Sequence, residues 1–211
     1  MGTRGGGMGG TGGGMDENDD TAWVLISGGA TTVNAGGDGV DSNGDLTITG
    51  GQTYVSGPTD AANGALDYEG TGTISGGVLV AAGSAGMAQN MGSDSTQASL
   101  LVAATGDAGD TITLADSSGT VLASFSPAKS YQCAVISAPD IEVGQTYTLT
   151  SGSTTTEVTP DSLVYSSADV AAGDMGMGGG MQGGTQMDGT MPDADGQAPT
   201  GTTAAQTSTT A

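Results

Sequence analysis

A repeated glycine pair constrains the fold of this chain more than any other feature of its sequence. The pattern Ile-Ser/Thr-Gly-Gly occurs at residues 26–29, 48–51 and 74–77, so that successive copies are separated by 22 and 26 residues. A period of this length indicates stacked structural repeats, and the short β-type segments within it favour a β-solenoid.

The alignment of the repeats brings acidic residues into register. Residues 39–51 align with residues 65–77, and Asp41 then falls on Asp67. Adjacent parallel strands lie about 4.8 Å apart, so aligned side chains stand directly above one another. We therefore expect the two carboxylates to be stacked.

Within each repeat, apolar residues alternate with polar ones at a period of two, which is typical of strands with one buried face. The Gly-Gly pairs should form tight bends between two strands of a coil, because glycine adopts backbone angles that other residues resist. Thr47, Tyr54 and Thr73 are expected to face outward. The residues expected to face inward are Val24, Ile26, Thr31, Val33, Leu46, Ile48, Thr53, Val55, Ile74, Leu79 and Ala81.

The repeat fades after Gly83, and the later short β-like runs are separated by turn signals. They are predicted to be hairpins that either close the last coil or form a small β module on its end. The expected fold is all-β, a parallel β-helix of few coils. The expected organisation is a disordered Gly/Met-rich segment at 1–20, β-helix coils at 21–98, a C-terminal strand and hairpin region at 99–170, and a disordered tail at 171–211.

The charge balance restricts the possible partners. Two basic residues, Arg4 and Lys129, stand against 23 acidic ones, which gives a formal net charge of −21. Such a chain has no basic surface to replace the counterions of nucleic acid or of an anionic membrane. Cations are expected partners; the alternative is that the charge only maintains solubility. There is no histidine and a single cysteine, Cys133, so neither a disulfide framework nor a CxxC metal site is expected.

No run of about 18 apolar residues is present, so no membrane insertion is expected. The first residues also lack the basic and then apolar pattern of a signal peptide. Either the protein is intracellular or the chain is the C-terminal piece of a longer protein, and we favour the second interpretation.

The acidic, glycine-rich turns are candidates for a calcium site. Ca²⁺ takes six to eight oxygen ligands from carboxylates, amides, backbone carbonyls and water, and it would relieve the repulsion between stacked carboxylates. The alternative is that these residues face water at turns, where Asp, Asn and Gly are common. The predicted metal ligands are Asp38, Asp41, Asn43, Asp45, Asn63, Asp67 and Glu69.

Three aromatic residues are candidates for sugar binding, because an exposed ring can stack on a pyranose face. Tyr54 faces outward in the predicted alternation, Tyr68 adjoins Asp67, and Trp23 opens the first coil. An equally plausible role for Trp23 is that of a plug over the edge of the core.

Three stretches resemble a known family: ISGGATTVNAGGDGVDSNGDLTITGG (26–51), GPTDAANGALDYEGTGTISGGVLVAAGSAGMAQ (57–89) and SPAKSYQCAVISAPDIEVGQTYTL (126–149). The chain resembles carbohydrate-binding domain-containing proteins related to a clostridial cellulose- and acidic-sugar-binding protein. The resemblance implies a right-handed parallel β-helix similar to that of polysaccharide lyases, bound calcium, and binding of cellulose and polygalacturonate without a need for catalysis.

The function expected from the sequence is that of a non-catalytic, calcium-dependent polysaccharide-binding module in the secreted fraction or at the cell surface. One alternative is a pectate-lyase-like enzyme, whose chemistry needs a basic residue beside the metal. Arg4 and Lys129 are both far in sequence from the acidic turns, which argues against catalysis. A second alternative is a purely structural surface protein.

Overall fold

The computed structural model describes residues 21–171, and the segments expected to be disordered, 1–20 and 171–211, lie almost wholly outside the described residues. The described part is all-β apart from one short helix, α1 (Ala168–Ala171), as the sequence predicted. It contains no helix that is long and apolar enough to cross a membrane.

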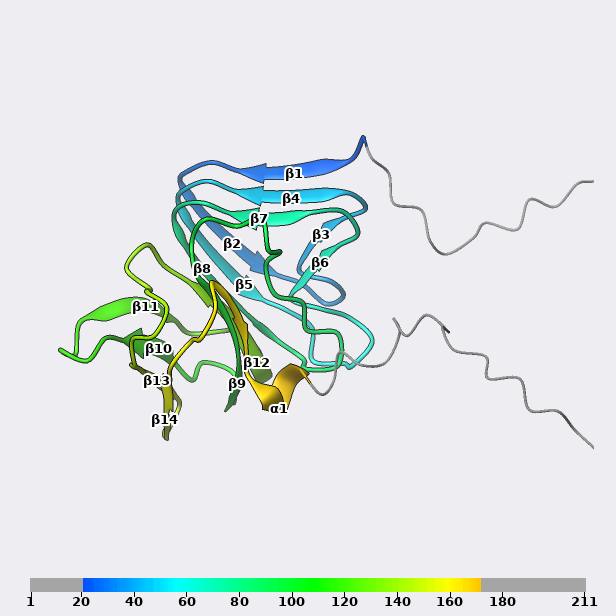
Figure 1. Cartoon of the computed structure of the whole chain (residues 1–211). Helices are drawn as coiled ribbons and strands as arrows, with labels where there is room; N and C mark the ends of the chain where they lie inside the picture. Colours follow the sequence, from blue (N-terminus) through cyan, green and yellow to red (C-terminus); the bar gives the residue numbers. More distant parts are fainter. Residues whose placement is uncertain (1–20, 172–211) are drawn as a thin grey trace, which may run out of the picture. The chain divides into compact units, whose positions relative to one another are not determined.

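The strands between residues 23 and 83 form three parallel stacks (Figure 1). The first two passages of the chain add one strand to each stack in turn, and the third adds a strand to two of them, because the Ile-x-Gly-Gly repeat returns the backbone to the same position. The stacks are β1 (Trp23–Ile26), β4 (Asp45–Ile48) and β7 (Gly72–Ile74); β2 (Ala30–Asn34), β5 (Gln52–Ser56) and β8 (Val78–Gly83); and β3 (Val40–Ser42) with β6 (Leu66–Tyr68).

The register of these stacks confirms the alignment of the repeats. Ile26 pairs with Ile48, and Ile48 pairs in turn with Ile74. Asp41 is the parallel partner of Asp67. The predicted alternation is also confirmed: Ile48 and Ile74 are at most 1% exposed, whereas the neighbouring outward positions are partly exposed.

The Gly-Gly pairs form bends with a left-handed backbone at the second glycine of each pair. Gly29, Gly51 and Gly77 have φ angles of 77°, 87° and 86°. The turns also lie in contact along the stack, because a Cβ atom on Gly51 would stand 2.7 Å from the carbonyl oxygen of Gly29. Glycine is therefore required at residue 51 by conformation and by space.

The loop that follows β8 covers one end of the stacks. The side chain of Gln89 accepts a hydrogen bond from the Tyr68 amide and donates one to the Tyr68 carbonyl, both at 3.0 Å. Further along the loop, the amides of Thr96 and Gln97 both donate to the carbonyl of Ile74. Backbone and side-chain groups of this loop thus form hydrogen bonds with backbone groups at the edges of β6 and β7. Without the loop, a further strand would be needed to pair with these groups.

The region after residue 98 extends the second stack by three strands, only one of which runs antiparallel to the others. The six-stranded sheet has the order β15-β9-β12-β8-β5-β2, in which β12 pairs antiparallel with β8 and with β9. This sheet is therefore mixed, which a solenoid of parallel coils alone does not explain. The added strands are β9 (Ser99–Gly106), β12 (Tyr131–Ser137) and β15 (Val164–Ser166).

A separate antiparallel sheet has the order β11-β10-β13-β14. One of the two apolar clusters of the core runs from this sheet to β8, so the packing is continuous across the boundary predicted at residues 98 and 99. The strands of this sheet are β10 (Ile112–Ala115), β11 (Val121–Phe125), β13 (Tyr147–Ser151) and β14 (Thr154–Val158).

Lys129 joins the C-terminal region to the parallel stacks. Its ammonium group donates to the carbonyl oxygens of Ala35 and, at 3.5 Å, Gly57. The preceding amide, of Ala128, donates to the Ser56 hydroxyl at 2.9 Å. The only lysine or arginine among residues 21–171 is thus bound to backbone carbonyls at the ends of β2 and β5.

Candidate functional site

Asp41 and Asp67 form the centre of the candidate site. They are paired residues of the adjacent parallel strands β3 and β6, and both point away from the core. Asp41 is exposed and Asp67 is half-buried. The strand spacing of about 4.8 Å places two like charges close together, as the repeat alignment predicted.

Other carboxylates surround this pair. Burial raises the pKa of the Asp67 carboxyl above its usual value. The negative charges of Asp38, Asp41 and Glu69 raise this pKa further. These four carboxylates, which we call the acidic face, therefore act on one another through a common electrostatic field.

Two of the predicted metal ligands also stabilise the stack itself. The Oδ1 atom of Asp38 accepts a hydrogen bond from the Gly64 amide at 2.7 Å, and Oδ1 of Asp45 accepts one from the Thr71 amide at 2.8 Å. Each bond joins residues 26 positions apart, on neighbouring turns of the chain. Charge-assisted hydrogen bonds of this kind account for the presence of aspartate at these two positions without a metal ion. Each bond leaves the second carboxylate oxygen of the side chain available to another partner.

The two predicted asparagine ligands lie in different surroundings. The amide nitrogen of Asn63 donates to Asp60 Oδ1 at 2.7 Å, so this side chain is held by its own turn. The same aspartate accepts from the Ala62 amide at 3.0 Å, and these bonds lower the pKa of the Asp60 carboxyl. Asn43 is exposed on the loop after β3, close to Asp41.

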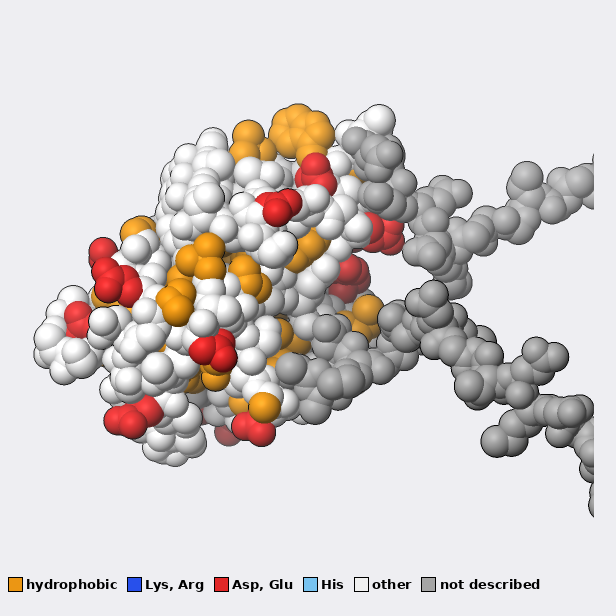
Figure 2. All heavy atoms as spheres, viewed as in Figure 1, with side chains coloured by type: hydrophobic (Ala, Val, Ile, Leu, Met, Phe, Trp, Pro, Cys, Tyr) orange, Lys and Arg blue, Asp and Glu red, His pale blue; other side chains and the backbone are white. Residues whose placement is uncertain are grey.

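A shallow groove brings one predicted sugar-binding residue beside the predicted metal ligands. It has a volume of about 330 Å³ and is lined by residues 22–24 and 41–43. It thus places Trp23 next to Asp41 and Asn43. Figure 2 shows hydrophobic side chains of β1 standing out at the top of the molecule, with acidic side chains below them.

The three predicted sugar-binding aromatics differ in exposure. Trp23 is 68% exposed, so its expected alternative role as a plug over the core is wrong. Tyr54 is half-buried and stacks on Phe125, with ring centroids 5.1 Å apart. One face of the Tyr54 ring is thus covered by the C-terminal region.

The expectation that Tyr68 offers a ring to solvent is also wrong. Its side chain is 9% exposed and packs in the core over Gly72. Its hydroxyl donates to the Asn90 carbonyl at 2.5 Å. The ring turns inward because β6 is a three-residue strand in which the outward position belongs to Asp67.

The residues of the acidic face fit calcium better than they fit a softer metal. Among residues 21–171, no group of three or more His, Cys, Asp or Glu side chains is placed so that it could hold a metal ion by itself. Oxygen ligands from amides, backbone carbonyls and water would have to complete the shell around Asp41 and Asp67, and calcium accepts such mixed, irregular shells.

Lys129 lies nearer to the acidic turns than its position in the sequence indicated. Its ammonium contacts the carbonyl of Ala35, three residues before Asp38. The argument that sequence distance separates this lysine from the acids is therefore wrong. Its contacts with two carbonyl oxygens give it a structural role instead.

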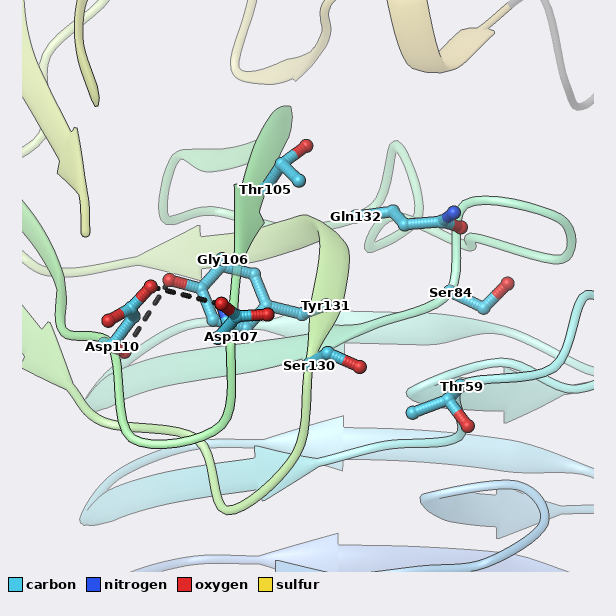
Figure 3. A pocket seen from close by; sticks show the side chains of 9 residues that line it. All are labelled: Thr59, Ser84, Thr105, Gly106, Asp107, Asp110, Ser130, Tyr131 and Gln132. Carbon is cyan, nitrogen blue, oxygen red and sulfur yellow. Dashed lines mark hydrogen bonds between the residues drawn. The ribbon is translucent and has the colours of Figure 1, made fainter. Parts of the chain in front are cut away.

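A second hollow was not foreseen from the sequence. This polar cavity has a volume of about 370 Å³ and is lined by residues 59, 84, 105–107, 110 and 130–132 (Figure 3). Four separate segments of the chain form its walls, so no local motif identifies it. Comparisons with known proteins add no assignment, because no family model, curated protein or solved structure matches this chain.

Proposed function

We propose that this protein is a non-catalytic, calcium-dependent polysaccharide-binding module that acts outside the cell or at its surface. The observation that carries the proposal is the groove in which exposed Trp23 adjoins Asp41, the parallel partner of Asp67. The three parallel stacks are, in this proposal, coils of a right-handed β-helix.

The acidic face would hold the metal ion through Asp41 and Asp67, with Asn43 and the free oxygen of Asp38 as further ligands. Bound calcium supplies positive charge that a uronate carboxylate of the polysaccharide can share. Without this charge, a protein with a net charge of −21 should repel polygalacturonate. The Trp23 ring offers an apolar face on which a sugar ring of cellulose or polygalacturonate can stack.

Calorimetric titration with Ca²⁺ and then with polygalacturonate tests this proposal. We expect calcium binding by the wild type and a loss of at least tenfold in calcium affinity in Asp67→Asn, because one of the two stacked carboxylates is removed. Asp94→Asn is the matched control, since Asp94 is exposed in a loop and should leave affinity unchanged. Full polygalacturonate affinity in excess chelator would contradict the bridging role of calcium.

The pH dependence of stability gives an independent readout. The raised pKa of Asp67 means that its neutral form is favoured in the folded state, so its contribution to stability is present at low pH and is lost as the pH rises through the raised value. In chelator at neutral pH, Asp67→Asn should therefore have a higher Tm than the wild type. The difference should shrink as the pH falls through the raised pKa, and saturating calcium should reverse it.

A polysaccharide lyase is the second candidate, because Lys129 lies near the acidic turns: it contacts the carbonyl of Ala35, three residues before Asp38. To act as a base it would have to leave this structural contact. Incubation with polygalacturonate and calcium distinguishes the two, because a lyase releases unsaturated uronides that absorb in the ultraviolet. Absence of binding to any glycan on an array would instead favour a purely structural surface protein.

A further inference from the structure

The polar cavity lies where the parallel stacks meet the C-terminal strands. In Figure 3, Thr59, Ser84 and Gln132 line one side, and Asp107 and Asp110 lie on the other. Its volume of about 370 Å³ falls within the range of small-molecule sites. No residue of this cavity belongs to the acidic face, so the two sites are distinct.

The walls of the cavity are fixed by hydrogen bonds. The Tyr131 hydroxyl bonds to the Ser151 hydroxyl at 3.0 Å, and Asp110 Oδ2 accepts from the Asp107 amide at 3.0 Å. Gln132 Oε1 accepts from the Ala85 amide at 3.2 Å. These bonds fix Tyr131, Asp110 and Gln132, and with them the shape of the cavity, which lowers part of the entropic cost of binding.

Several polar groups of the lining remain available to a ligand. Within residues 21–171, the hydroxyls of Thr59, Thr105 and Ser130 form no hydrogen bond, nor does the carboxylate of Asp107. The amide nitrogen of Gln132 is likewise free, because its oxygen makes the bond to Ala85. Hydroxyls both donate and accept, whereas a carboxylate only accepts. This combination suits a ligand that carries several hydroxyl groups of its own.

Charge and shape narrow the class of ligand. Asp107 and Asp110 would repel a uronate or a phosphate, and the one lysine among the described residues is bound elsewhere. The Tyr131 side chain is only 3% exposed, so no aromatic face is offered for stacking. Recognition would therefore depend on hydrogen bonds alone.

We propose that this cavity is a calcium-independent binding site for a neutral hexose unit. Vicinal hydroxyls of the sugar donate to the Asp107 carboxylate, while Ser130 and the Gln132 amide bond to its remaining oxygens. The site would give the protein a second point of contact with a neutral glycan, separate from the groove at Trp23.

Titration of the full chain with glucose in excess chelator, followed by NMR or calorimetry, tests the proposal. We expect saturable binding of glucose and at least tenfold weaker binding of glucuronate, which differs by one carboxylate. Asp107→Asn and Ser130→Ala should each weaken glucose binding at least fivefold. Asp94→Asn and Ser117→Ala, at exposed positions outside the cavity, should bind glucose as the wild type does.

Thermal unfolding of each variant separates a loss of binding from a loss of folding, and Ser130→Ala provides a second test if Asp107→Asn is unstable. Lack of saturable glucose binding by the wild type, equal affinity for glucuronate, or unchanged affinity in both cavity variants would overturn the proposal. Because chelator is present throughout, these outcomes are independent of whether the acidic face binds calcium.

Discussion

The two ends of the parallel stacks differ in whether other parts of the chain cover them. At one end, the loop after β8 bonds to Tyr68 and Ile74, and β12 pairs with β8. At the other end, β1 and β2 are the outermost strands of their sheets among residues 21–171. Ile74 is fully buried, whereas Ile26, in the same ladder, is partly exposed.

Burial in this stacked fold therefore depends on the neighbouring turn of the chain more than on the local sequence. The three isoleucines of the ladder stand in nearly identical tetrapeptides. Only Ile48 and Ile74, which have chain packed on both sides of the ladder, are fully buried. The covered end also uses side chains such as Gln89 in place of a strand, so an edge can be satisfied without regular pairing.

Truncation of the ladder should have the largest effect on stability. Ile74→Ala removes a fully buried side chain at the covered end and should lower the free energy of unfolding by about 2–5 kcal/mol. Ile26→Ala, at the uncovered end, should cost about half as much, since less apolar surface is lost. Denaturant unfolding of both variants checks this order, and equal costs would contradict the contrast between the two ends.

The glycine bends offer the next test of the same contrast. A Cβ atom on Gly29 meets nothing within 4 Å, so Gly29→Ala should cost only the left-handed backbone strain of about 1–2 kcal/mol. Gly51→Ala has a similar φ but also meets backbone atoms of the preceding turn, which should add about 1–3 kcal/mol. Thermal unfolding measures both, and a smaller loss in Gly51→Ala than in Gly29→Ala would refute the close contact.

The smallest expected effect concerns the covering loop. Gln89→Ala removes both hydrogen bonds to the Tyr68 backbone and should lower the free energy of unfolding by about 0.5–1.5 kcal/mol, because water can reach these part-buried groups and replace some of the lost hydrogen bonding. Hydrogen exchange of the Tyr68 amide should accelerate in this variant. Gln52→Ala, an exposed position of β5, is the control in which this amide should exchange as in the wild type.

The repeat made the stacked part of the fold predictable. Alternation located the inward residues, and the alignment of the repeats was sufficient to predict the pairing of Asp41 with Asp67. These predictions needed only the internal symmetry of the sequence, because each turn of the chain provides the template for the next.

Features that depend on the irregular part of the chain could not be predicted in this way. Tyr54 is covered by Phe125, which belongs to a region without repeats. The antiparallel addition of β12 to β8 and the polar cavity both arise from contacts between distant segments. For the predicted metal ligands, the sequence identified the carboxylates, but not that Asp38 and Asp45 already accept hydrogen bonds from backbone amides of the next turn.

The position of Lys129 has a consequence for how this protein responds to dissolved salt. Its ammonium lies on two carbonyl oxygens and not on a carboxylate, and the described residues contain no other lysine or arginine. Ions at about 0.1 M screen charges beyond roughly 10 Å, and here such screening acts almost entirely between groups of the same sign. Rising ionic strength should therefore make the native state more stable. The added cations reduce the repulsion between carboxylates, which basic side chains reduce in most proteins.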